Sequence, residues 1–249
     1  MNEPNIENPE TKSEKKTLKI KKIDVFYLAA IILTLAFVIT MRCIEGFGDI
    51  VWLTDIRVIF GITGVILLTK QKWLTYPFEI VAIVLVGVVA IVQHVWLTGV
   101  VAFAVSLPMA IYAMINWKKG AKSEKPAVRK LTKKQYLVIS IVGLAALALS
   151  MFLMYYIGGN VWYLDSVLFV LTFIRLYLYA NLYLDMFYIQ LTDNVFAISM
   201  FAILSFQNIN NVSNIVMYLI LIPLNLIGLL NWKTLHKQQQ GEMKTDAAV

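Results

Sequence analysis

One short stretch near residue 190 concentrates the side chains that could bind a small polar molecule. It reads Asp185-Met186-Phe187-Tyr188-Ile189-Gln190-Leu191-Thr192-Asp193-Asn194. If this stretch is helical, Phe187, Gln190 and Asn194 stand at positions i, i+3 and i+7 and share one face. Amide groups donate and accept hydrogen bonds, and an aromatic ring stacks on a flat ligand. The face therefore predicts a site for a planar polar ligand. The alternative is that these amides hydrogen-bond between packed helices.

Other polar side chains stand inside apolar stretches, where each is costly and is a candidate for function. Asn225, close after Pro223, is a second candidate for ligand binding, and Gln207 and Glu79 are weaker candidates because they lie nearer helix ends. The remaining ionisable residues of this kind are Asp55, Arg57, Asp165, Arg175, Asp185 and Asp193. For Asp55 and Asp165 the simpler interpretation is that of acids anchoring the first turn of a helix.

Patterns of catalysis and metal binding do not occur in the sequence. Cys43 is the single cysteine, and the two histidines, His94 and His236, lie far apart and outside the apolar stretches. There is no H-E-x-x-H, no Walker glycine loop and no G-x-S-x-G. The sequence therefore predicts a protein that is not an enzyme and has no catalytic residues, metal site or cofactor.

The elements that must position these residues are membrane-spanning helices. Of the 249 residues, 59% are apolar and 15% charged, against roughly a quarter charged in soluble domains, and the mean hydropathy is +0.72. Too few polar side chains remain to cover a water-facing surface, so most of the outer face must meet lipid. Because unpaired backbone cannot face lipid, the prediction is an all-α polytopic membrane helix bundle. The net charge of +7 reflects an excess of Lys and Arg, which we expect to set the topology of the spans. It implies no nucleic-acid partner.

Eight apolar stretches bounded by charge predict eight spans. They are Val25 to Ile44, Val51 to Thr69, Leu74 to Val92, Leu97 to Trp117, Leu137 to Ile157, Val161 to Leu182, Met186 to Phe206 and Val212 to Trp232. Basic residues gather before the first span, after the second and from Lys118 to Lys134, whereas the intervening connections carry no Lys or Arg. Basic connections stay in the cytoplasm. We therefore expect a multi-pass protein of the cell membrane with both termini cytoplasmic.

Two short patterns recur in the same order along the chain. Val51-Trp52-Leu53-Thr54-Asp55 is matched by Val161-Trp162-Tyr163-Leu164-Asp165, and the P-x7-N-W pattern of Pro108 to Trp117 by that of Pro223 to Trp232. The spacing predicts two parallel triple-helix repeats, 50–117 and 161–233, joined by a linker helix at 137–157. The remaining segments are predicted as a cytosolic tail at 1–24, an extra N-terminal transmembrane helix at 25–45, a basic cytosolic loop at 118–136 and a cytosolic tail at 234–249. A substrate path would lie between the repeats.

The stretch from Tyr183 to Val195 resembles the pattern Y-x-E-x-W-x-x-W-x-x-x-N-V of the PnuC family of vitamin transporters, which is related to the SWEET sugar carriers. Asp185 stands at the acidic position and Asn194 at the Asn, while Phe187 and Gln190 stand where the family has Trp. Asn225 matches an Asn of the last helix. Ala110 and Glu79 take positions where the family has Asn. The resemblance covers about residues 50 to 235 and implies a core of three, one and three helices.

This resemblance implies uptake of nicotinamide riboside, an NAD precursor, by facilitated diffusion, with cytosolic phosphorylation trapping the product. The alternatives are a related carrier for thiamine, riboflavin or deoxynucleosides and, less favoured, a membrane scaffold that transports nothing. A scaffold would not need broken-helix repeats or an amide-lined face. The substrate-binding residues that we expect are Asn194, Gln190, Phe187, Asn225, Gln207 and Glu79. The expected partners are a small vitamin or nucleoside and the lipid bilayer, and homo-oligomerisation stays open.

Overall fold

The computed structural model describes residues 9–45, 51–92, 99, 101–120, 127–157, 161–206 and 212–246. Its elements in chain order are α1 (Pro9–Glu45), α2 (Val51–Thr69), α3 (Thr75–Val92), the π-helical segment η1 (Ala102–Ser106), α5 (Leu107–Gly120), α6 (Lys133–Ile157), α7 (Trp162–Ala180), α8 (Met186–Ser205) and α9 (Val212–Asp246). Apart from one isolated bridge between Arg129 and Tyr183, the regular structure of these residues is helical. The predicted all-α fold class is confirmed.

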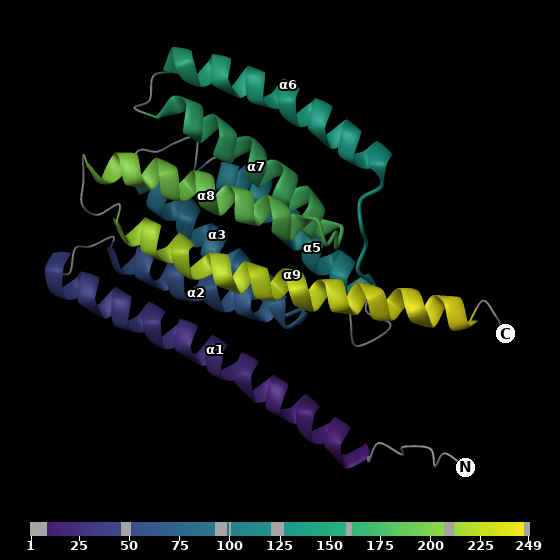
Figure 1. Cartoon of the computed structure of the whole chain (residues 1–249). Coiled ribbons are helices and arrows are strands. Elements are labelled where there is room, and N and C mark those ends of the chain that lie inside the picture. The colour runs from purple at the N-terminus through teal and green to yellow at the C-terminus, as the bar shows by residue number, and fades with distance from the viewer. Residues whose placement is uncertain are drawn as a thin grey trace, which may run out of the picture.

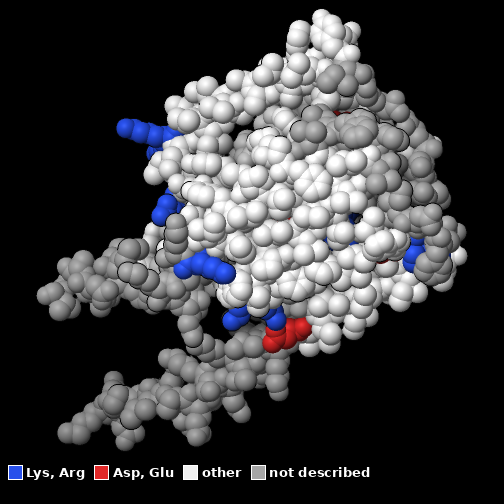
Figure 2. Space-filling model, turned by 180° about the vertical axis from the view of Figure 1, so that it is seen from behind, with Lys and Arg blue, Asp and Glu red and all other residues white. Residues whose placement is uncertain are grey.

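The surface of the bundle is suited to lipid. Four described helical stretches are long and apolar enough to cross a membrane: Lys133–Tyr156, Trp162–Ala180, Met186–Ser205 and Asn214–Gly241. Asp24–Thr40 and Thr75–Val88 are apolar but shorter. Large apolar side chains such as Leu137, Val142 and Leu144 of α6 are exposed. Figure 2 shows a broad uncharged face, with most of its Lys and Arg side chains gathered along one edge. Water would not solvate such a surface, so the outer face of α6 must meet lipid.

The helices form two groups of three that pack on each other in a reciprocal way (Figure 1). One group contains α2, α3 and α5, and the other contains α7, α8 and α9. The groups meet where α2 contacts α9 and where α5 contacts α7, so the first helix of each group packs against the third helix of the other. Helix α6 packs on α7, outside this core, and α1 packs on α2 and α9.

Helix α1 is attached to the core by polar contacts near both ends of its packed part. The Thr69 hydroxyl donates a hydrogen bond to the Tyr27 hydroxyl at 2.7 Å. Toward the other end, Arg42 forms an ion pair with Asp55 at 2.8 Å. The interpretation of Asp55 as an acid of the first turn is wrong, because α2 begins at Val51 and Asp55 lies beyond its first turn; Asp55 instead holds α1 against α2.

Two helices are longer than their apolar stretches. Helix α1 begins at Pro9 rather than Val25, and α9 continues from Trp232 to Asp246. The added segments are rich in Lys, Glu and Gln, which are good helix formers. The helices therefore continue beyond the apolar stretches. In Figure 1 the start of α1, the start of α6 and the end of α9 lie toward the same end of the bundle.

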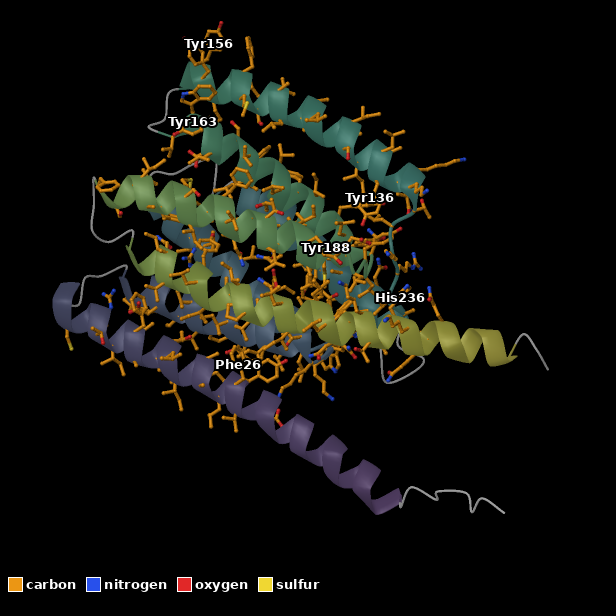
Figure 3. All side chains as sticks on the ribbon, viewed as in Figure 1. Phe26, Tyr136, Tyr156, Tyr163, Tyr188 and His236 are labelled. Carbon is orange, nitrogen blue, oxygen red and sulfur yellow. The ribbon has the colours of Figure 1, made fainter. Side chains whose placement is uncertain are left out.

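Aromatic side chains mark the two ends of α6. Tyr156 and Tyr163 lie at one end of the bundle, and Tyr136 and His236 lie at the other (Figure 3). Tyr136, Tyr156 and Tyr163 are exposed. Exposed tyrosines toward both ends of a bundle are typical of the two interfacial belts of a membrane protein.

Candidate functional site

A cavity of about 220 Å³ lies between the two groups of helices. Helix α2 contributes Arg57, Gly61, Ile62, Val65 and Leu68, α3 contributes Glu79, Ala82, Ile83 and Val86, and α7 contributes Arg175 and Tyr179. The remaining lining residues are Met186, Phe187, Gln190 and Asp193 of α8 and Met217, Tyr218, Leu221 and Asn225 of α9. Most of this lining is apolar, with a few convergent polar groups, as is typical of small-molecule sites.

The start of α8 is fixed by the turn that precedes it. Leu182 adopts a positive φ of 60°, and the amide of Tyr183 donates to the Leu178 carbonyl at 2.9 Å, which closes the end of α7. Asp185, 2% exposed, then accepts hydrogen bonds from the Leu131 amide at 2.8 Å and from the Tyr136 hydroxyl. This turn places the first residues of α8, including Phe187, against the cavity.

The two amides of α8 have different positions. Gln190 lines the cavity, whereas Asn194 is fully buried and is not among the lining residues. The Gln190 Nε2 donates to the Asn194 Oδ1 at 3.2 Å. The Asn194 Nδ2 has no hydrogen-bond partner within the described residues. The predicted shared face is therefore present, but Asn194 holds Gln190 in place from behind.

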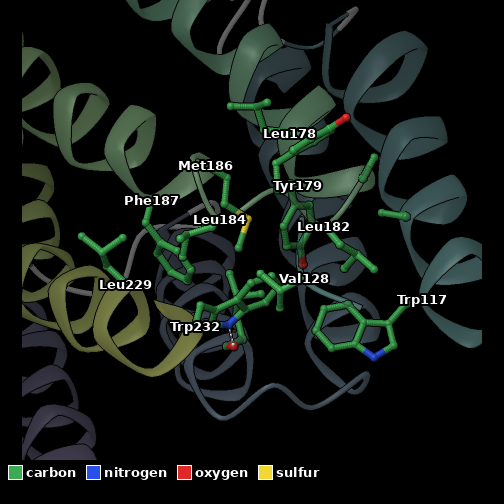
Figure 4. Close-up of a cluster of buried hydrophobic side chains, with 14 of the residues drawn as sticks. Trp117, Val128, Leu178, Tyr179, Leu182, Leu184, Met186, Phe187, Leu229 and Trp232 are labelled. Atoms are coloured by element: carbon green, nitrogen blue, oxygen red, sulfur yellow. Dashed lines mark hydrogen bonds between the residues drawn. The ribbon is translucent and has the colours of Figure 1, made fainter. Parts of the chain in front are cut away.

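Phe187 lies in the wall of the cavity and is 1% exposed. Its ring packs edge to face on Trp232, with centroids 5.6 Å apart at 72°, and Figure 4 shows the two rings grouped with Leu229. Gly228 makes room for this ring, because a Cβ there would stand 2.4 Å from the Phe187 Cε1. Phe187 is therefore held rigidly by α9.

Asn225 and Glu79 also line the cavity. Asn225 is 1% exposed, lines the cavity from α9, and its Nδ2 has no hydrogen-bond partner in the described part of the chain. A buried amide without a partner is costly, and a ligand atom would satisfy it. Glu79 lines the opposite wall from α3. Gln207 lies outside the described residues.

Three charged residues line the cavity besides Glu79. They are Arg57, Arg175 and Asp193. All three lie inside predicted spans as ionisable residues, but they were not predicted as binding residues. The Arg57 Nη2 donates to the Asn214 Oδ1 at 3.5 Å, and the Arg175 Nη1 lies 3.9 Å from the Glu79 Oε1. Their intramembrane position was the signal that could have found them.

The fold and the cavity define a polytopic membrane protein with an internal cavity between its two groups of helices. The sequence pattern of the nicotinamide mononucleotide transporter family matches residues 51–234. The nicotinamide riboside transporter PnuC of Neisseria mucosa is 21% identical over 198 residues, which cover 77% of this chain and 75% of that protein. The crystal structure of the vitamin B3 transporter PnuC is similar with a TM-score of 0.68 and 20% identity, over 84% of this chain and 92% of that chain.

The chain belongs to the nicotinamide mononucleotide transporter family. It is therefore a membrane transporter and not an enzyme. The similarity of fold to the solved PnuC structure and the family match confirm the resemblance that the stretch from Tyr183 to Val195 suggested.

Proposed function

We propose that this transporter carries nicotinamide riboside across the cell membrane by facilitated diffusion and that cytosolic phosphorylation traps the product. The observation that carries the proposal is that Gln190 and Asn225, from two different helices, line one cavity between the helix groups. The family match and the relative named for nicotinamide riboside support the choice of ligand.

The polar groups of the site suit the parts of this ligand. The carboxamide and the ribose hydroxyls both donate and accept hydrogen bonds, as the side chains of Gln190 and Asn225 do. The apolar lining and the edge of Phe187 suit the pyridine ring. In this proposal Asn194 orients the Gln190 amide, and Glu79 contacts the ligand from α3. Gln207 stays a predicted contact from the sequence alone.

The alternative ligands fit less well. A cavity of about 220 Å³ is below the roughly 300–1,000 Å³ of drug-sized sites, which disfavours the fused three-ring system of riboflavin. Thiamine lacks the carboxamide and the ribose.

Both termini are proposed to be cytoplasmic. The start of α1, the start of α6 and the end of α9 lie toward one end of the bundle in Figure 1, and the basic residues near Lys130 favour the cytoplasmic side. Cys43, which is exposed, lies at the far end of α1. An impermeant thiol reagent should label native Cys43 on intact cells and should fail to label Lys130→Cys in a Cys43→Ser background. Labelling with the reverse preference would contradict this orientation.

Calorimetry on the purified protein tests the ligand and the site together. The panel is nicotinamide riboside, its mononucleotide, thiamine, riboflavin and a deoxynucleoside. We expect the riboside to bind most tightly, and Gln190→Leu or Asn225→Leu to weaken it about tenfold or more, since each loss leaves a ligand group unpaired.

Asn116→Leu is the matched control. The Asn116 Nδ2 donates to the Ala180 carbonyl at 3.4 Å, and its side chain does not line the cavity. This variant should lose stability and keep the affinity of the wild-type protein. If another panel member binds most tightly, that molecule and not the riboside is the substrate. Wild-type affinity in the folded Gln190 and Asn225 variants would refute the site.

A further inference from the structure

Four charged side chains line the cavity, the acids Glu79 and Asp193 and the arginines Arg57 and Arg175. Among them, Arg175 of α7 interacts with both acids, Glu79 of α3 and Asp193 of α8. The Arg175 Nη1 lies 3.9 Å from the Glu79 Oε1, and Asp193 lies within electrostatic range of the same guanidinium. Two carboxylates thus interact with one guanidinium, and these three side chains carry a formal charge of −1, which Arg57 offsets over the cavity as a whole.

The second arginine, Arg57, is held on another side of the cavity. The Arg57 Nη2 is directed to the amide oxygen of Asn214 at 3.5 Å, on the side of the cavity formed by α2 and α9. Arg57 keeps its positive charge beside this neutral amide, whereas Glu79 of α3 is paired with Arg175.

The contact between Glu79 and Arg175 is loose enough to admit a ligand. A distance of 3.9 Å exceeds the roughly 2.7–2.9 Å of a charge-assisted hydrogen bond. The two side chains keep 20% and 24% of their surface exposed, and Arg175 Nε has no hydrogen-bond partner among the described residues. The Glu79 carboxylate therefore retains acceptor capacity toward the cavity.

Glu79 also occupies a position that corresponds to that of Gln190. The two residues are 111 apart, as are Gln71 and Leu182, the described non-glycine residues with positive φ that follow the first helix of each group. Both Glu79 and Gln190 line the cavity. A ligand between α3 and α8 therefore meets an amide on one wall and a carboxylate at the corresponding place on the other.

We propose that Glu79 and Asp193, which share Arg175, make the site selective for a positively charged aromatic ring, with Glu79 as the residue that senses the charge. The inference rests on the proposed function, because the pyridinium ring of nicotinamide riboside is a cation. A positively charged ring beside Glu79 offsets the local excess of the two carboxylates over Arg175, and pairing a charge inside a membrane is favourable.

The test compares nicotinamide riboside with its 1,4-dihydro form, which keeps the carboxamide and the ribose but has a neutral ring. Binding of both to each purified variant is measured by calorimetry, and the ratio of the two dissociation constants is the readout. The wild-type protein should prefer the cation. Glu79→Gln should lower this preference about tenfold, because it leaves Arg175 without its partner, and Arg175→Gln should raise it by a similar factor.

These opposite directions separate charge sensing from a structural role. A structural pair would weaken both ligands together in both variants and leave the ratio unchanged, and that result would overturn the inference. Asp165→Asn, in the first turn of α7 and outside the lining of the cavity, is the matched acid control and should leave the ratio unaltered.

Asp193→Asn provides a second variant if Glu79→Gln does not fold, and it should also lower the preference for the cation. An unchanged ratio in the folded Asp193 and Arg175 variants would overturn the inference while the riboside remains the ligand. A wild-type protein that binds neither form would contradict the proposed function and this inference together.

Discussion

Trp117 and Trp232 meet edge to face at the contact between the two helix groups, with ring centroids 5.9 Å apart at 71°. Both are almost fully buried, and they are the tryptophans of the two P-x7-N-W patterns. Each also packs edge to face on the aromatic residue that begins the second helix of its own group, Tyr76 for Trp117 and Phe187 for Trp232. These matched contacts support the predicted pair of repeats.

The asparagine before each tryptophan ties its helix to the opposite group. The Asn231 Nδ2 donates to the Thr69 carbonyl at 3.1 Å, and the Asn116 Nδ2 donates to the Ala180 carbonyl at 3.4 Å. Each bond satisfies a carbonyl at the end of a helix, which has no partner within that helix. The two groups thus cap each other's first helices.

Asn231→Leu should destabilise the protein by about 1–3 kcal/mol, because the Thr69 carbonyl loses its partner in a buried place. Asn116→Leu should act in the same direction with a smaller effect, since its hydrogen bond is longer. Thermal unfolding in detergent measures both. Asn181→Leu, which breaks only a contact within the end of α7, should shift the midpoint less, and equal shifts in all three variants would contradict the reciprocal capping.

Gly228→Ala should lower both stability and ligand affinity. The added Cβ would lie 2.4 Å from the Phe187 Cε1, so the ring must move from its place in the cavity wall. Gly241→Ala is the control on the same helix, where a Cβ meets nothing within 4 Å, and alanine favours helix over glycine there. Binding and unfolding are measured for both, and Phe187→Leu should partly restore stability to Gly228→Ala. Equal stability and equal ligand affinity in the Gly228 and Gly241 variants would contradict the packing of Phe187 against Gly228.

Asp185→Ala should loosen the segment before α6. The carboxylate accepts from the Leu131 amide at 2.8 Å and from the Tyr136 hydroxyl, and Arg129 exchanges backbone hydrogen bonds with Leu182 and Leu184 beside it. Loss of the buried acceptor should cost about 1–3 kcal/mol. Limited proteolysis should then cut residues 127–132 faster than in the wild-type protein. Asp185→Asn keeps one acceptor oxygen, so its rate of cleavage should lie between those of the wild-type protein and the alanine variant. A wild-type rate of cleavage in the alanine variant would contradict this role of Asp185.

Much of the fold could be predicted because it depends on patterns within the chain. Apolar stretches predicted the helices, and the spacing of Phe187, Gln190 and Asn194 predicted their common face. The group formed by Glu79, Arg175 and Asp193 could not be predicted, because it depends on how three separate helices cross. The burial of Asn194 behind Gln190 likewise depends on the rotation of α8 against its neighbours, which sequence spacing does not determine.

Uptake of labelled nicotinamide riboside into proteoliposomes, with the membrane potential clamped at zero, tests the central claim most directly. The clamp is needed because the ligand is a cation, and a potential of 100 mV alone would supply about 2.3 kcal/mol for its accumulation. We predict that the internal concentration rises to the external value and stops there without a sodium or proton gradient. Uptake no faster than in protein-free vesicles would contradict transport of the riboside. Accumulation above the external concentration at zero potential, abolished by Glu79→Gln, would contradict facilitated diffusion.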